Sequence, residues 1–498
     1  MFMWYNGQTM KSDALQRTAL YKYRYVVGFV ALALLVLAIA TWQFWVLPNG
    51  LTEVEMVTAA SAGHFSLSQI LKNVVNLPWT ILEWLSIKTF GATVFAFRLP
   101  AVILMILSAG GLVLLLRKWT RNNIAIVGAF LAMTSMLFVG LSRLGTPSAM
   151  TTFLIVAVLL STIIIIRAVE KLSQGEEKNL VLHNWRTLSA KVALCVALAL
   201  LCYQTAGIYL VAVFIAVGIA HPKTRLIFIK SKPWRIAVGV AVGLLVMLPL
   251  IIGLVLGGFT LIQEWLAWNG SAWSLEHLSL FWSAFAGFEA SFAGGLVTPA
   301  LTLLGLIFVA LGIIRVGTSA MSARSYLVLS FLLTALLLAI WQPTLMYLLF
   351  VPLALLTTIG IEALVREWYD LFPRNPYARL LPIAPLTVLI VGLGWTSIMR
   401  YNLSQNYDAN VVYNYSQEFS AVRSILDKEK NVTIVVSPDQ KKFYEILQND
   451  FPEMSIATEL RKDTKNIVLG SASVENSDIP SKIVTDSRAK NSVLLRVY

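Results

Sequence analysis

Apolar runs of about 20 residues recur from Tyr25 to Met399, and few charged residues interrupt them. A helix of that length crosses a bilayer. The 498 residues are 57% hydrophobic and 13% charged, whereas a soluble domain carries roughly 25% charged residues. The runs therefore predict an α-helical membrane protein with many spans, and they exclude a soluble fold for most of the chain.

The apolar runs predict about eleven membrane spans. The fifth and sixth runs are short, and a re-entrant pair of helices is the alternative for them. The predicted spans are 25–47, 97–116, 123–142, 148–167, 189–203, 206–220, 236–258, 296–315, 325–341, 344–364 and 380–399.

Lys and Arg are unevenly divided between the two sides of these spans. One side holds most of them and includes the N-terminus, whereas the other side holds only Lys72, Lys88, Arg98 and Arg143. Positive charge marks cytoplasmic loops, so we expect a cytoplasmic N-terminus and, after an odd number of spans, an extracytoplasmic C-terminus. This bias explains the net charge of +13 without a nucleic-acid partner.

Two predicted outer segments, 48–97 and 259–295, are longer than simple connections. In the first, Thr52 followed by Glu53 and Glu55 predicts a short capped helix with acids in its first turn. The rest of that segment is apolar at helical spacing, which predicts helices that lie in the membrane interface. The second segment is rich in Trp and Phe, typical of an aromatic belt or of a gate over a lipid-tailed or sugar ligand.

The composition changes after Met399, so we divide the chain into a transmembrane domain, 1–400, and a small extracytoplasmic domain, 401–498. Strand-like segments at 431–437, 466–472, 481–486 and 491–498 and an amphipathic helix at 439–450 predict an α/β domain with a partly parallel sheet. The segment shows no catalytic pattern, and we interpret it as a lid or as an acceptor-recognition module.

Three single residues on the predicted outer side draw attention. Arg143 ends a span where positive charge is otherwise rare, so it either reaches lipid headgroups or holds a phosphate. Lys88 is the second candidate cation for holding that phosphate. His64 lies near the two acids and either joins their site or is solvated. No His, Cys, Asp and Glu cluster has metal-ligand spacing, so we predict no cofactor, although a divalent cation stays open.

Four motifs occur in a characteristic order: "GLTEVEM", "NLPWTILEWLSIKTFG", "FRLPAVILMILSAGGLVLLLRKW" and "LSRLGTPSAM". In this order they resemble the polytopic glycosyltransferases of the GT-C class, specifically the branch of protein O-mannosyltransferases and aminoarabinose transferases (glycosyltransferase family 39-like). The resemblance covers about residues 25–365.

The resemblance implies an inverting transfer of a sugar from a polyprenyl-phosphate carrier to an acceptor on the outer side of the cell membrane. In such enzymes an acid of the first outer loop is the base, which Glu55 matches in register, with Glu53 as the second candidate. Cations hold the carrier phosphate. The implied substrate-binding residues are Arg143, Lys88, His64, Trp79 and Arg98.

The chain departs from the family pattern in this region. The usual Asp-Glu pair aligns with Val54 and Glu55, the basic residue before the proline element is absent at Asn76, and an acid after Arg143 would fall at Ser148. A catalytically inactive protein that binds or assembles lipid-linked glycans is therefore one alternative. A transporter is another, although transporters place charges near the bilayer midplane, where these spans have almost none.

The partners that follow from the resemblance are a polyprenyl-phosphate sugar lipid, an acceptor that is a glycan, a lipid or a protein, and the surrounding membrane lipids.

Overall fold

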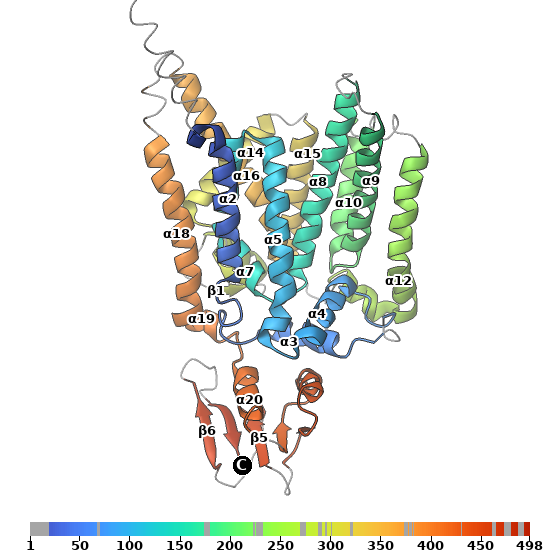
Figure 1. Cartoon of the computed structure of the whole chain (residues 1–498), viewed down its shortest axis with the longest axis vertical. Coiled ribbons are helices and arrows are strands. Elements are labelled where there is room, and N and C mark those ends of the chain that lie inside the picture. Colours follow the sequence, from blue (N-terminus) through green and yellow to red (C-terminus); the bar gives the residue numbers. More distant parts are fainter. Residues whose placement is uncertain are drawn as a thin grey trace, which may run out of the picture.

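A bundle of apolar helices carries a small sheet domain at one of its ends (Figure 1). This computed structural model describes residues 19–66, 70–173, 180–222, 225, 233–268, 275–286, 291–293, 296–299, 301–318, 322–372, 377, 381, 383–429, 431–460, 465–472, 480–486 and 493–498. The predicted fold class, a helical membrane domain followed by a small α/β domain, is confirmed.

The long helices of the bundle follow the predicted apolar runs. In the described part of the chain, six helices are long and apolar enough to span a membrane, and four shorter apolar helices accompany them. The count of about eleven spans stays a prediction. The long helices are α5 (Val94–Trp119), α8 (Ser148–Ser173), α9 (Leu180–Cys202), α12 (Pro233–Trp265), η2 with α16 (Pro343–Leu349 and Phe350–Leu371) and α18 (Ile383–Tyr407), and the shorter ones α2 (Ala19–Thr41), α10 (Gly207–Ala220), α14 (Leu303–Thr318) and α15 (Ala323–Trp341).

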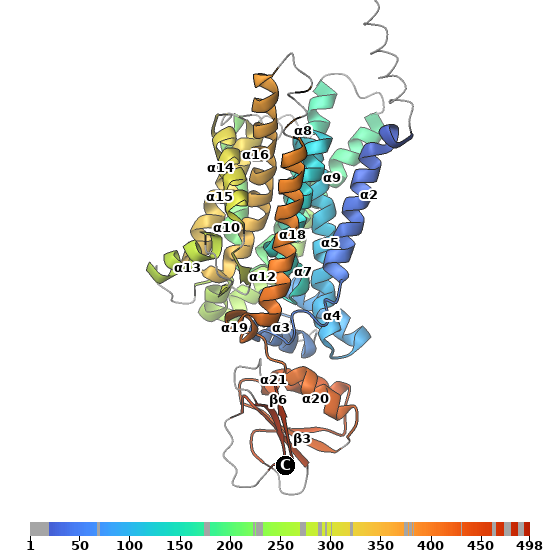
Figure 2. The same ribbon diagram turned by 90° about the vertical axis from the view of Figure 1, so that its left-hand side faces the viewer.

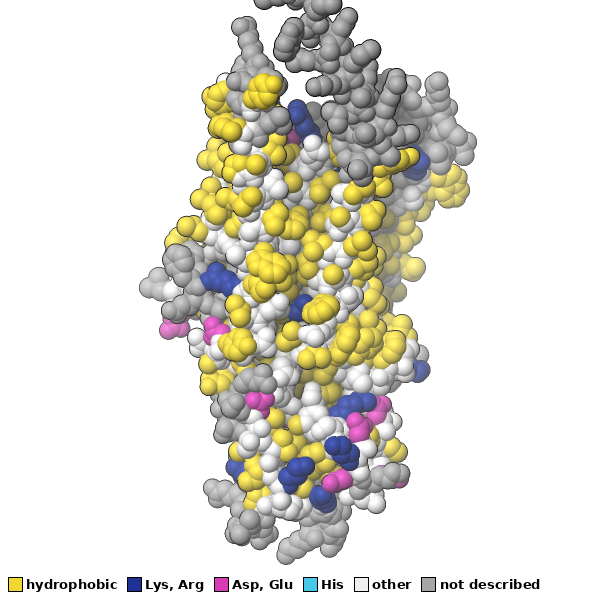
Figure 3. Space-filling model, turned by 60° about the vertical axis from the view of Figure 1, so that its left-hand side comes forward, with side chains coloured by type: hydrophobic (Ala, Val, Ile, Leu, Met, Phe, Trp, Pro, Cys, Tyr) yellow, Lys and Arg dark blue, Asp and Glu magenta, His cyan; other side chains and the backbone are white. Residues whose placement is uncertain are grey.

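Figure 3 shows apolar side chains over the visible face of the bundle and Lys, Arg, Asp and Glu gathered on the sheet domain below it. This distribution is that of a chain with one part in lipid and one part in water.

The span predicted at 123–142 is divided in two. Helices α6 (Asn122–Thr134) and α7 (Met136–Arg143) meet at a bend of 58°. Ser135 has an extended backbone between them, and its side chain accepts a hydrogen bond from the N–H of Phe138, so α7 begins with its own N-cap. The bend places Arg143 at the end of a short helix inside the bundle.

The outer segments lie at the end of the bundle that carries the sheet domain. Helices α3 (Glu53–Gly63) and α4 (Leu77–Phe90) occupy the first one (Figure 1). In the second, α13 (Leu275–Ala286) precedes a hairpin of β1 (Ser291–Ala293) and β2 (Leu296–Thr298). Strand β2 occupies the first residues of the span predicted at 296–315, so helix α14 begins only at Leu303.

The C-terminal domain has a five-stranded sheet in the order β4-β3-β5-β7-β6. Strand β3 pairs in parallel with β4 and β5, and β7 pairs antiparallel with β5 and β6. The predicted helix at 439–450 is a short α-helical turn followed by a 3-10 turn. The elements are α19 (Ala409–Val412), α20 (Glu418–Leu426), β3 (Val432–Val435), α21 (Lys441–Tyr444), η3 (Glu445–Asn449), β4 (Ser455–Ala457), β5 (Lys465–Leu469), β6 (Lys482–Thr485) and β7 (Val493–Val497).

The C-terminal domain is docked against the first outer segment (Figure 2). Leu51 and Ser416 exchange two backbone hydrogen bonds of 2.8 Å. The Asp450 carboxylate accepts a hydrogen bond of 2.8 Å from the N–H of Ala92. Apolar residues of α3, such as Met56 and Ala59, share one buried cluster with the domain. These contacts hold the C-terminal domain against this segment.

Candidate active site

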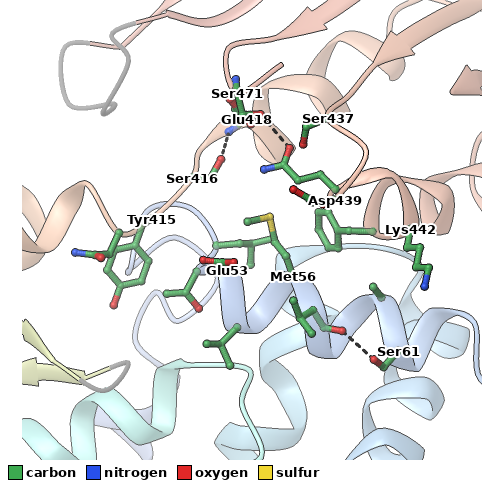
Figure 4. A pocket seen from close by; sticks show the side chains of 18 of the residues that line it. Glu53, Met56, Ser61, Tyr415, Ser416, Glu418, Ser437, Asp439, Lys442 and Ser471 are labelled. Atoms are coloured by element: carbon green, nitrogen blue, oxygen red, sulfur yellow. Dashed lines mark hydrogen bonds between the residues drawn. The ribbon is translucent and has the colours of Figure 1, made fainter. Parts of the chain in front are cut away.

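A cavity of about 1190 Å³ lies between α3, the segment that leads into the C-terminal domain, and the domain itself (Figure 4). Ligand pockets of proteins commonly measure about 300–1,000 Å³, so this cavity has room for more than one sugar ring. Its charged side chains are Glu53, His64, Lys72, Glu418, Asp439, Lys442 and Glu445, and its aromatic ones are Phe292, Tyr413, Tyr415 and Phe443.

Helix α3 begins with the capping box that the sequence predicts. The Thr52 hydroxyl accepts a hydrogen bond from the N–H of Glu55, and the Glu55 carboxylate accepts one of 2.9 Å from the N–H of Thr52. The same carboxylate accepts bonds of 2.9 Å from the N–H of Gly145 and from Nε of Arg98. Glu55 has 0% exposure and does not line the cavity.

Arg98 is buried with Glu55 and uses its whole guanidinium on the protein. Its five N–H groups donate to both Glu55 oxygens and to the carbonyls of Phe44, Pro48 and Gly50. Arg98, which belongs to α5, therefore holds the segment between α2 and α3 and the first turn of α3 in place. In this arrangement neither Arg98 nor Glu55 has a free group for a substrate, and the substrate roles predicted for them stay predictions.

Glu53 lies on another face of α3 because residues two apart on a helix point in different directions. Its side chain is exposed and lines the cavity (Figure 4). Among the residues that the structure describes, none forms a hydrogen bond or ion pair with this carboxylate. Glu53 is thus the predicted acid that can meet a substrate directly.

Two predicted residues, His64 and Lys88, lie at the surface. His64 lines the cavity, and its Nε2 is 3.3 Å from the Glu445 carboxylate of the C-terminal domain. Lys88 is exposed in the last turn of α4, where its Nζ lies 5.0 Å from the centre of the Trp84 ring. The structure brings His64 to the cavity with Glu53 and leaves Lys88 outside its lining.

Trp79 is buried in the bundle and donates a hydrogen bond of 2.8 Å from Nε1 to the Glu83 carboxyl. Burial raises the pKa of Glu83 well above its usual value, and nearby Glu55 raises it further against the lowering effect of the Trp79 bond. Burial therefore favours the protonated form of the Glu83 carboxyl. The sequence analysis missed it, although a lone acid in "WTILEWL" was the available signal.

Arg143, the last residue of α7, is buried beside Tyr401 of α18. Its Nη2 donates to the carbonyl of Ile39 at 3.2 Å, and its guanidinium lies 5.4 Å from the centre of the Tyr401 ring. The Tyr415 hydroxyl, which lines the cavity, accepts a hydrogen bond of 3.0 Å from Gln405. We call Arg143, Tyr401, Gln405 and Tyr415 the buried polar cluster.

The sequence analysis found only Arg143 of this cluster. Tyr401 and Gln405 are four residues apart, so they lie on one face of α18. The sequence pattern that could have identified them is this pair of polar residues at helical spacing near the end of the last apolar run. Nothing in the sequence placed that face against Arg143.

The family description that matches the chain is dolichyl-phosphate-mannose-protein mannosyltransferase, over residues 76–252. The match includes Trp79, Lys88, Arg98 and Arg143. No curated protein matches the chain.

Two solved structures are similar to the chain. ArnT from Cupriavidus metallidurans, bound to undecaprenyl phosphate, is 13% identical with a TM-score of 0.53, and the likeness covers 95% of this chain and 98% of that one. The oligosaccharyltransferase AglB from Archaeoglobus fulgidus, in complex with an inhibitory peptide and a dolichol-phosphate, is 12% identical with a TM-score of 0.51. The likeness covers 86% of this chain but only 64% of AglB.

Proposed function

We propose that this GT-C class membrane glycosyltransferase moves a sugar from a polyprenyl-phosphate carrier to an acceptor at the extracytoplasmic face of the cell membrane. The observation that carries the proposal is the unpaired carboxylate of Glu53 in a large cavity at one end of the membrane bundle. The end that holds the cavity is the extracytoplasmic one if the bias of Lys and Arg is followed.

In the proposed reaction, Glu53 accepts the proton of an acceptor hydroxyl while that oxygen attacks the anomeric carbon of the sugar. The bond from the anomeric carbon to the carrier phosphate breaks, and the phosphate leaves with the electron pair. Attack from the opposite side inverts the anomeric centre. A cation offsets the charge on the leaving phosphate, and Arg143 and Lys88 are the predicted candidates.

The bonds around Glu55 support Glu53 as the base. Donors from Thr52, Arg98 and Gly145 surround the Glu55 oxygens, so an acceptor hydroxyl would have to displace one of them. We assign Glu55 the role of holding the start of α3, and with it Glu53, in place. The complexes of the two similar structures, ArnT with undecaprenyl phosphate and AglB with a dolichol-phosphate, favour a lipid phosphate as the carrier of the sugar.

The test uses membranes that contain the full chain and a panel of undecaprenyl phosphates carrying radiolabelled sugars. Transfer is the movement of label from the lipid extract into other material. We expect Glu53→Gln to slow transfer by about 10²–10⁴-fold with no loss of thermal stability, because the side chain is exposed and unpaired. Glu459→Gln, an exposed acid outside the cavity lining, is the matched control.

Full transfer by Glu53→Gln would contradict the assignment of the base. A wild-type chain that binds the labelled donors and transfers none would support the alternative of a non-enzymatic glycan-lipid binder. Accumulation of a free labelled solute inside sealed vesicles would instead indicate a transporter.

A further inference from the structure

The buried polar cluster contains several polar atoms that have no partner in the described part of the chain. They are Nε and Nη1 of Arg143, the hydroxyl of Tyr401 and Oε1 of Gln405. The side chains are almost fully buried, at 3%, 1% and 4% exposure. Buried polar atoms are normally hydrogen-bonded, and a gathering of unpaired ones indicates a missing ligand or water.

Charge identifies the kind of ligand. The other buried arginine, Arg98, is neutralised by Glu55 at 2.9 Å, whereas no described carboxylate pairs with Arg143. A buried charge without a counter-ion is strongly unfavourable. The site therefore calls for an anion.

The chemistry of the unpaired donors fits a phosphate oxyanion. Nε and Nη1 of Arg143, which carry three N–H groups between them, and the Tyr401 hydroxyl have no partner among the described residues. The orientation of the Gln405 amide is assigned from its surroundings, and a flip would turn its NH₂ group from Tyr415 toward the anion while its oxygen accepts the Tyr415 hydroxyl. After this flip, each unpaired polar atom of the cluster has a hydrogen-bond partner, which is either the anion or Tyr415.

The position of the cluster suits a ligand that arrives from lipid and reacts in water. Helix α18, which bears Tyr401 and Gln405, exposes most of its surface, including Val388 and Trp395. On the other side, Tyr415 belongs both to the cluster and to the lining of the cavity. Tyr415 therefore connects the buried polar cluster to the cavity that contains Glu53.

We infer that Arg143, Tyr401 and Gln405 bind the phosphate of the lipid carrier, and that Tyr415 is the wall between this phosphate site and the acceptor cavity. The inference deepens the proposed function and rests on it. It adds Tyr401 and Gln405 as positioning residues from the last helix. It also predicts that the carrier phosphate is held by one arginine and two neutral side chains.

The test measures binding of undecaprenyl phosphate to the full purified chain in lipid nanodiscs, with no sugar transfer required. Undecaprenol, which has the same tail without phosphate, and inorganic phosphate are the two comparison ligands. The variant is Tyr401→Phe, which removes only a hydroxyl that has no protein partner. Its matched control is Tyr407→Phe on the same helix, where the side chain is 82% exposed.

We expect Tyr401→Phe to raise the Kd for undecaprenyl phosphate about tenfold and to leave undecaprenol binding and the melting temperature unchanged. We also expect inorganic phosphate to compete with the lipid in the wild type and less so in Tyr401→Phe. Tyr407→Phe should match the wild type.

Equal binding of undecaprenyl phosphate by wild type and Tyr401→Phe would overturn the inference, and the proposed function would still stand. Binding of inorganic phosphate without competition from the lipid would assign the cluster to a free ion and also overturn it. A wild-type chain that binds none of the lipid phosphates would overturn the proposed function itself.

Discussion

Arg98 and Arg143 are both buried in the helical bundle, and they differ in how many of their N–H groups have a hydrogen-bond partner. Arg98 donates all of its N–H groups to the protein and is neutralised by Glu55. Arg143 donates one bond of 3.2 Å to Ile39 and leaves Nε and Nη1 unpaired. The first arrangement is complete without a ligand, and the second is not.

This difference separates a structural arginine from a binding one. A buried ion pair contributes little net stability, but removal of one partner leaves an uncompensated charge. The Glu55–Arg98 pair therefore holds backbone segments at a fixed geometry, whereas Arg143 is stable only if a ligand or water meets it. The two acids of α3 differ in the same way. Hydrogen-bond donors surround both carboxylate oxygens of Glu55, whereas the Glu53 carboxylate has no partner among the described residues.

Removal of each arginine gives the sharpest test of the comparison. Arg98→Met should lower the free energy of unfolding by about 3–5 kcal/mol, because Glu55 stays buried and charged. Arg143→Met should lower it little or not at all, because an unpaired charge is replaced by an apolar side chain, while undecaprenyl phosphate binding is lost. Thermal and denaturant unfolding in detergent measure both variants, and equal losses of stability would refute the distinction.

A second test concerns the buried carboxyl group of Glu83, which lies near the Glu55–Arg98 pair. Burial raises the pKa of Glu83, so the folded chain takes up a proton there, and its stability falls as the pH rises from the unfolded pKa toward the folded one. Relative to Glu83→Gln, the wild type should lose at most about 1.4 kcal/mol per pH unit in this window. Unfolding midpoints measured from about pH 5 to about pH 8 check the slope, and parallel curves would show that Glu83 does not take up a proton.

A third test measures how tightly the protein packs around the Glu55–Arg98 pair. The N–H of Gly145 donates to Glu55, and a Cβ at this position would lie 2.6 Å from the carbonyl oxygen of Phe97. Gly145→Ala should therefore cost about 1–3 kcal/mol of stability.

Gly110 provides the control for that substitution, because a Cβ there meets no atom within 4 Å. Gly110→Ala should be neutral or should stabilise the chain by up to about 1 kcal/mol, since alanine favours a helix. A neutral Gly145→Ala would mean that the segment around Glu55 can shift.

The smallest effect is expected where an ion pair is exposed. His64 and Glu445 are 3.3 Å apart with 42% and 32% of their side chains exposed. Glu445→Gln should change the free energy of unfolding by less than about 1 kcal/mol, well below Arg98→Met. A loss comparable to that of the buried pair would show that this contact is essential for docking the C-terminal domain.

Several local features could be predicted from short stretches of sequence. The apolar runs predicted the helices of the bundle, and Thr52 with Glu55 predicted the cap of α3. Four strands of the C-terminal domain, β3, β5, β6 and β7, were also predicted from their apolar residues. These predictions succeeded because helix caps and side-chain periodicity depend on residues a few positions apart.

Two predicted span boundaries were wrong. The bend at Ser135 and strand β2 (Leu296–Thr298) lie within apolar runs that a helix would continue. The α20 helix and strand β4 were missed because they are short and their burial depends on packing in the C-terminal domain.

By itself, the sequence determined that this chain is a helical membrane protein with a capped acidic helix after the first apolar run and an α/β domain after the last one. Only the tertiary structure decided that Glu55 meets Arg98, that Glu53 faces the cavity and that Tyr401 meets Arg143. The physical reason is distance along the chain. Periodicity fixes which side chains share a face of one helix, but the partner of that face is chosen by the packing of segments that are distant in the sequence.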